Sequence, residues 1–92
     1  MTAASRPRLT AKARLRFDRK TDQYLLLYPE RGMMLNSSAT AILLLCTGKD
    51  TVATIIDRLT WAYTDQRREV IEQELMSFLG DMARRGLVRE EL

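Results

Sequence analysis

Apolar and polar side chains alternate strictly near the start of the chain. In residues 11–18, every second position is apolar and the positions between them are charged. Because successive residues of a strand point to opposite faces, this pattern predicts a half-buried antiparallel strand. Residues 23–28 are almost wholly apolar or aromatic, which is typical of a central strand covered on both faces. The polar residues 19–22 between the two segments predict a hairpin.

A turn and a third strand are expected after this hairpin. The turn covers residues 29–32, where Pro29 can fix the first corner and Gly32 can adopt a positive φ. Residues 33–35 then leave room for only a short strand. The polar residues 36–38 can each accept a hydrogen bond from the free amides of a starting helix, so the helical part should begin there.

The second half of the chain predicts three helices. The first covers residues 39–46 and is ended by a glycine two residues later. The second begins after Asp50 or Thr51 as its cap. Apolar residues recur at 3.6-residue spacing along one face of this second helix: Val52, Ile55, Ile56, Leu59, Ala62 and Tyr63. The third helix covers residues 66–85 and ends at Gly86; its apolar stripe consists of Ile71, Leu75, Phe78, Leu79 and Met82.

The two ends of the chain carry no clear pattern. Residues 1–8 mix small, polar and basic side chains with one proline, and we expect them to form a flexible arm. Leu87 and Val88 can add a short extended piece, whereas the charged residues 89–91 should fray. The prediction is therefore one domain over residues 9–92. Its class is α+β and winged-helix-like, with a three-stranded antiparallel sheet followed by three helices.

The composition excludes most enzyme chemistry. The chain has 92 residues, no histidine and one cysteine, Cys46. This removes histidine-based metal sites, Ser-His-Asp and Cys-His nucleophile pairs and any internal disulfide. We therefore expect no catalytic residue, no metal and no cofactor, with Cys46 packed as a small hydrophobic residue. No apolar run approaches the roughly 18 residues of a membrane span, and no signal peptide is evident, so a cytoplasmic protein that does not enter a membrane is expected.

The positive charge is concentrated at the start of the chain. The net charge is +3, but residues 1–20 carry +6 and residues 21–92 carry −3. Lys12, Arg14 and Arg16 give the first predicted strand a basic rim that could contact phosphates or an acidic partner. A solvated strand face is the commoner explanation for such residues.

A winged-helix protein that binds nucleic acid is the main alternative. Its recognition helix should carry basic or amide side chains that reach the bases. The third predicted helix instead balances four arginines against four acidic residues, and the acidic residues lie in the half where base contacts would be made. The sequence therefore disfavours nucleic acid as a partner. A third hypothesis is an enzyme that uses Cys46 as its nucleophile.

The third predicted strand would lie at an edge of the sheet, with unpaired backbone groups. Proteins usually protect such an edge with lysine, proline or a bulge, and Met33, Met34 and Leu35 provide none of these. The edge could accept a strand from a peptide, although composition alone favours a short strand covered by a helix. On the third helix, Gly80 and Ser77 make a low spot where another backbone, from this domain or a partner, could approach closely.

Four segments of the chain form a recognisable sequence. They read Ala13-Arg14-Leu15-Arg16-Phe17-Asp18-Arg19, Tyr24-Leu25-Leu26-Leu27-Tyr28-Pro29-Glu30-Arg31-Gly32, Leu35-Asn36-Ser37-Ser38-Ala39 and Ile42-Leu43-Leu44-Leu45-Cys46-Thr47-Gly48. Together they resemble the PqqD family, the small peptide chaperones of pyrroloquinoline quinone (PQQ) biosynthesis. The similarity covers about residues 9–88, and residues 26–32 are its most distinctive part.

The resemblance implies peptide binding without catalysis. Members of this family bind the ribosomally made precursor peptide PqqA and present it to the radical S-adenosylmethionine enzyme PqqE. Their fold is a RiPP recognition element, the domain that binds precursors of ribosomally synthesised and post-translationally modified peptides. The leader peptide typically adds as an antiparallel strand to the third strand, in a groove walled by the third helix. The peptide-binding residues that the resemblance implies are Arg31, Gly32, Met33, Met34 and Leu35 on the strand and Glu72, Leu75, Met76, Leu79 and Ala83 on the helix.

The resemblance makes an open third strand the preferred interpretation. It does not say which surface docks the partner enzyme or whether two copies of the chain associate. The basic rim at Lys12, Arg14 and Arg16 is our candidate for docking the partner enzyme. Without peptide, an open edge and an apolar wall could pair with a second copy to form a homodimer.

Overall fold

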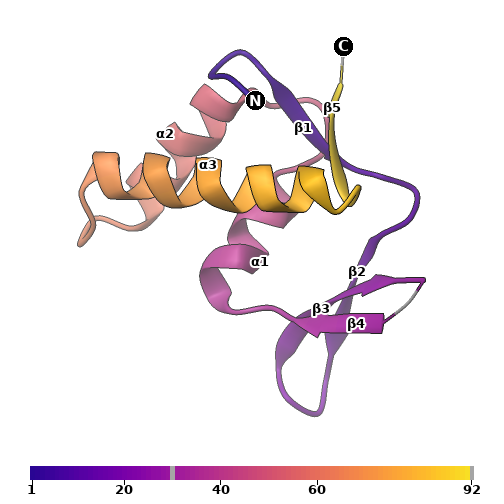
Figure 1. Ribbon diagram of the computed structural model, residues 1–92. Coiled ribbons are helices and arrows are strands. Elements are labelled where there is room, and N and C mark those ends of the chain that lie inside the picture. The colour runs from indigo at the N-terminus through magenta and orange to yellow at the C-terminus, as the bar shows by residue number, and fades with distance from the viewer. Residues whose placement is uncertain (30, 92) are drawn as a thin grey trace.

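A computed structural model describes residues 1–29 and 31–91 of the chain (Figure 1). Its elements follow the order β1 (Arg6–Leu9), β2 (Arg14–Asp18), β3 (Gln23–Tyr28), β4 (Arg31–Met34), α1 (Ser37–Leu44), α2 (Val52–Ala62), α3 (Arg68–Arg84) and β5 (Val88–Glu91). The described residues therefore confirm an α+β fold with three helices and a three-stranded antiparallel sheet. None of the described helices combines the length and apolar character needed to cross a membrane.

The strands β2, β3 and β4 form the predicted three-stranded sheet, in that order. In their register, Leu26 at the centre of β3 stands between Leu15 of β2 and Met33 of β4. Leu26 is fully buried, so the face that carries these three residues points to the core. β4 begins at Arg31, so Arg31 and Gly32 belong to the strand and not to the turn that we predicted; Glu30 lies outside the described residues.

Side-chain caps explain where the first two helices begin. The Asn36 side chain accepts a hydrogen bond from the Ala39 amide at 2.8 Å, and α1 starts directly after it. Thr51 caps α2 in the same way, by accepting from the Thr54 amide at 3.2 Å. The chain turns away after α1 at Gly48, whose φ of +83° favours glycine.

The two ends of the chain are paired, and this corrects the expectation of a flexible arm and a frayed tail. β1 pairs antiparallel with β5, so that Arg6 stands opposite Glu91 and Leu9 opposite Val88. Pro7 of β1 is fully buried. The segment before β1 is also held, because the Ser5 carbonyl accepts a hydrogen bond from the first amide of α2 at 2.8 Å. The partners of these residues are far away in the sequence, and a local pattern therefore does not reveal them.

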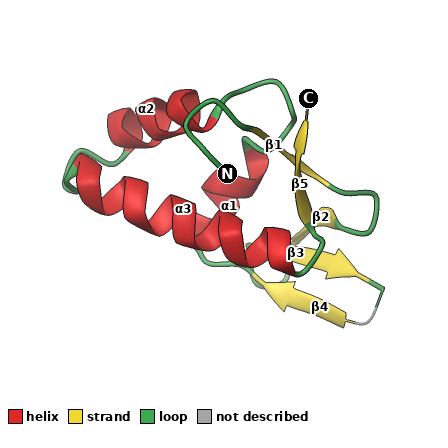
Figure 2. Ribbon diagram, turned by 45° about the horizontal axis from the view of Figure 1, so that its top comes forward, coloured by secondary structure: helices red, strands yellow, loops and turns green. Residues whose placement is uncertain are grey.

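The core lies between the helices and the two sheets (Figure 2). α3 contributes a buried stripe at the spacing of a helical face, and it is 17 residues long. The stripe consists of Ile71, Leu75, Leu79 and Met82. α3 is also joined to α2 by Arg68, whose guanidinium Nη2 lies 2.7 Å from Asp57 Oδ1. This hydrogen bond raises the pKa of Arg68. The buried stripe packs α3 against α2 and β5, and in Figure 1 the helix runs above β4.

Candidate functional site

β4 presents an open edge. It pairs with β3 on one side, and no described residue pairs with it on the other. The Leu35 amide donates to the Tyr24 carbonyl of β3 at 2.9 Å. In an antiparallel ladder, inward and outward backbone groups alternate along a strand. Met33 therefore bonds to β3, whereas the N–H and C=O groups of Gly32 and Met34 point outward and are available to a further strand.

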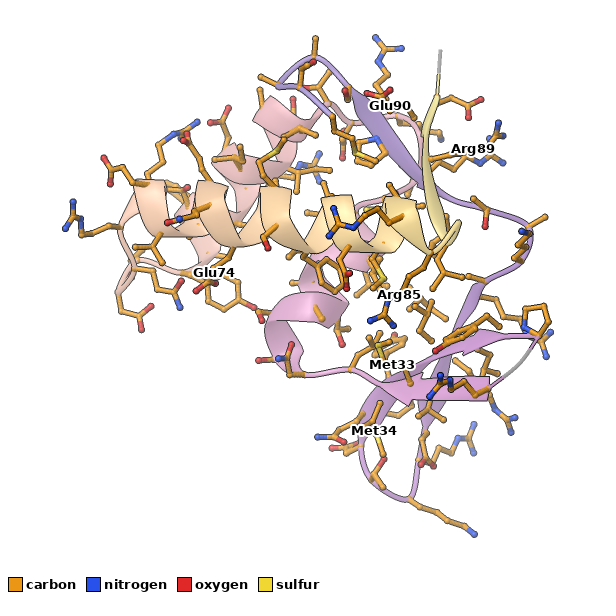
Figure 3. The ribbon with its side chains drawn as sticks, viewed as in Figure 1. Met33, Met34, Glu74, Arg85, Arg89 and Glu90 are labelled. Carbon is orange, nitrogen blue, oxygen red and sulfur yellow. The ribbon has the colours of Figure 1, made fainter. Side chains whose placement is uncertain are left out.

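A groove lies beside this edge. It has a volume of about 290 Å³ and is lined by Met33, Met34, Leu35, Asn36, Ser38, Ala39, Ile42, Glu74 and Phe78. Figure 3 shows Met33 in the space between α3 and the sheet and Met34 on the opposite side of β4. Met34 is 51% exposed, and Met33 is half-buried. The predicted strand residues Met33, Met34 and Leu35 are thus brought together at one groove.

The helix wall that we predicted is not the one that lines this groove. Leu75 and Leu79 have no exposed surface and belong to the core. Glu72, Met76 and Ala83 do not line the groove. An α-helix turns about 100° per residue, so these three lie on roughly the opposite side of α3 from the residues that do. From α3, the groove is lined by Glu74 and Phe78, and peptide binding by Glu72, Met76 and Ala83 stays a prediction.

The spacing of Glu74 and Phe78 in the sequence gives a weak indication that they act together. They are four residues apart, so they lie one above the other on the same side of a helix. We assigned Phe78 to the core stripe, and the structure shows it half-buried at the border of that stripe. The pattern of apolar residues identifies the buried face of α3, but it does not say on which side of that face the sheet lies.

The structure divides the basic rim into two parts. Arg14 and Arg16 stand opposite Leu27 and Leu25 on the outer face of the sheet, away from the core. Lys12 lies in the loop before β2 and lines a different hollow, beside the start of β4. Lys12 therefore lines a hollow that neither Arg14 nor Arg16 lines, and docking of a partner enzyme at these three residues stays a prediction.

Cys46 is a packing residue, as predicted. It is 4% exposed, and its thiol donates to the Ile42 carbonyl at 3.3 Å. Burial raises the pKa of the thiol to about 12, so the reactive thiolate is scarce near neutral pH. This argues against the hypothesis of a Cys46 nucleophile. Among the described residues, no group of three or more acidic or cysteine side chains is placed to hold a metal ion.

The fold and its open edge define an α+β domain that can accept an added strand, and comparison with known proteins identifies its family. A solved structure matches with a TM-score of 0.74 and 35% sequence identity, over 90% of this chain and 87% of the other. It is the NMR structure of the PqqD part of PqqCD from Methylobacterium extorquens, described as a functional and stand-alone RiPP recognition element. The two chains therefore share the α+β fold described above.

Sequence comparisons agree with the structural match. The model of the family "Coenzyme PQQ synthesis protein D (PqqD)" matches residues 23–88. A PqqA binding protein of Rhodopseudomonas palustris strain BisB5 is 39% identical, over 98% of this chain and 87% of that protein. A bifunctional coenzyme PQQ synthesis protein C/D of Methylorubrum extorquens is 37% identical, over 89% of this chain and 22% of that longer protein. The chain belongs to the PqqD family.

Proposed function

We propose that this protein binds the precursor peptide PqqA as an added strand on β4 and presents it to the radical S-adenosylmethionine enzyme PqqE in PQQ biosynthesis. The observation that carries the proposal is the open edge of β4, where Gly32 and Met34 turn their backbone groups outward beside a groove. The relatives named as PqqA binding proteins support the identity of the peptide.

The edge and the groove have separate tasks in this mechanism. Main-chain hydrogen bonds to Gly32 and Met34 supply affinity that does not depend on the peptide sequence. The side chains of Met33 and Phe78, together with Leu35 at the base of the groove, select apolar residues of the peptide. Because a flexible peptide loses conformational entropy when it binds, we expect micromolar to submicromolar affinity, which allows release to the enzyme.

Chemistry is assigned to the partner enzyme and not to this chain. Its relatives carry names that describe peptide binding, and its single thiol is buried and protonated. The fused C/D relative joins a related chain to another protein of the same pathway, which supports direct association with PQQ enzymes. Because the precursor is made on ribosomes, we place the encounter in the cytoplasm.

Titration of isotope-labelled protein with synthetic PqqA tests this function. Amide resonances of β4 and of residues near Glu74 and Phe78 should shift until the peptide saturates, while those of β1 and β5 change little. Unchanged spectra at high peptide concentration would exclude it. Adding PqqE to the complex should broaden the resonances further, and a complex that PqqE leaves unaffected would remove the presentation step.

Two other readings give different results in simple assays. Binding to nucleic acid should weaken steeply as the salt concentration rises. The structure does not favour such binding, because the arginines in and next to α3 lie beside acidic groups, at Asp57, Glu69, Glu72 and Asp81. A homodimer through the β4 edges should dissociate when peptide is added, because both would use the same backbone groups. Sedimentation with and without PqqA measures whether the peptide dissociates such a homodimer.

A further inference from the structure

A second hollow continues the β4 edge at the end opposite to the groove. Its volume is about 540 Å³, and it lies between the end of β3, the loop before β2 and the end of α3. The lining residues are Lys12, Tyr28, Pro29, Arg31, Arg85 and Leu87. Three of these six are cations and none is acidic. We call this the cationic hollow.

The chain compensates this charge only in part. Arg85 Nη2 lies 3.4 Å from Asp81 Oδ2, but the same carboxylate also faces Arg84 at 3.6 Å. Among the described residues, Lys12 and Arg31 have no partner within ion-pair distance. A negative group that enters the cationic hollow can therefore interact with several guanidinium and ammonium groups.

The register of an added strand connects the groove to the cationic hollow. Arg31 and Met33 are two residues apart on β4, so their side chains lie on the same face, toward α3. Figure 3 shows Arg85 and Met33 in the same space between α3 and β4. A peptide that runs antiparallel to β4 reaches Arg31 two residues after it has passed Met33, about 7 Å further along.

We propose that the cationic hollow binds a carboxylate side chain of the peptide, two residues after the apolar residue that packs on Met33. The proposal rests on the proposed function and adds to it a direction and a register. The groove has an acidic residue, Glu74, near its other end. A peptide in the reverse direction would bring its carboxylate toward Glu74, so the two charged ends of the site favour one orientation.

Charge removal in the cationic hollow tests the proposal. The double variant Arg31→Gln/Arg85→Gln should bind synthetic PqqA roughly tenfold more weakly in calorimetry at low salt. The difference should shrink at high salt, because screening weakens the lost interactions. Arg84→Gln is the matched control for the single variant Arg85→Gln, which should itself bind more weakly than the parent: both remove one charge from the same end of α3, but Arg84 lines another hollow. The affinity of Arg84→Gln should stay within about twofold of the parent.

A second measurement locates the carboxylate on the peptide. Each Asp and Glu of PqqA is replaced singly by Asn or Gln. One replacement should weaken binding to the parent protein about as much as the double variant does, and it should have little further effect on the double variant. Circular dichroism and urea unfolding verify that each protein variant is folded.

The outcomes separate this proposal from the proposed function. The proposal is wrong if the double variant binds like the parent, or if Arg84→Gln weakens binding as much as Arg85→Gln does. In either case, loss of binding in Met34→Pro would show that strand addition still holds, because this change removes an outward amide. If Met34→Pro binds as tightly as the parent, strand addition fails and the register proposal fails with it.

Discussion

The two edges of the three-stranded sheet differ in how they are protected. β2 forms one edge and carries Arg14 and Arg16, whose charged side chains are exposed. β4 forms the other edge and, after Arg31, continues with Met33 and Met34. Charged residues on an edge strand discourage further strands from pairing, whereas uncharged and flexible side chains do not. One sheet therefore has a guarded edge and an edge that can accept a strand, and we assign function to the second.

The backbone amides of β4 point alternately toward β3 and outward, and substituting them one at a time gives the strongest test of the difference between the two edges. Met33→Pro removes an amide that bonds to β3, whereas Met34→Pro removes one that points outward. We expect Met33→Pro to lower the free energy of unfolding by about 2 to 3 kcal/mol. Met34→Pro should leave that free energy nearly unchanged and abolish detectable PqqA binding. Urea unfolding and calorimetry measure the two quantities, and Met34→Ala, which keeps the amide, is the control. Equal effects of the two prolines on stability would contradict the assigned alternation.

The buried thiol of Cys46 reports whether a variant disturbs more than the edge. At pH 8, a thiol reagent should react slowly with the parent and with Met34→Pro, and at least tenfold faster with Met33→Pro. The raised pKa also gives a pH dependence. The folded state retains the thiol proton above the ordinary pKa of 9.0, so stability should fall as the pH rises from about 9 toward about 12. A Cys46→Ala variant should lack this part of the decline, and an unchanged decline would exclude Cys46 as its cause.

A second test adds a charge to the open edge at β4 and removes charges from the guarded edge at β2. Met34→Lys places a charge on the open edge and should weaken PqqA binding by about tenfold. Arg14→Thr/Arg16→Thr removes charges from the guarded edge and should raise the average mass in sedimentation above that of the parent at the same concentration. An unchanged mass would mean that something other than these arginines protects β2.

The smallest expected effect is that of substituting Gly80, which lies on the side of α3 that we do not assign to the peptide. A Cβ at this position would meet only the Arg84 Nη1 atom, at 3.6 Å, which is an ordinary contact. The close backbone approach that the sequence suggested is therefore absent within the described residues. Gly80→Ala should raise the free energy of unfolding by about 0.5 to 1 kcal/mol without changing PqqA affinity. A loss of affinity would show that a partner backbone does approach there.

Local patterns predicted the parts of the fold that depend on neighbours in the chain. The hairpin of β2 and β3, the cap at Thr51 and the apolar face of α2 all follow from spacing within about ten residues. The pairing of β1 with β5 joins Arg6 to Glu91. No local signal marks such a pair, because each strand has four residues and one contains a proline.

The strand side of the candidate groove could be predicted to the same degree, and its role in peptide binding stays a prediction. Met33, Met34 and Leu35 were identified because an edge strand without charge is visible in the sequence. The helix residues were assigned by resemblance to the side of α3 that bears Met76, but the groove is lined by Glu74 and Phe78. Which side of a buried stripe meets the sheet depends on how the helix crosses it, and that is decided by tertiary packing.

Amide hydrogen exchange on the β4 strand tests the central claim most directly. In the free protein, the amides of Gly32 and Met34 should exchange rapidly, and those of Met33 and Leu35 should be protected by β3. With saturating synthetic PqqA, Gly32 and Met34 should become protected as well. If PqqA binds while both of these amides still exchange rapidly, the peptide does not complete the sheet at β4 and the account is wrong.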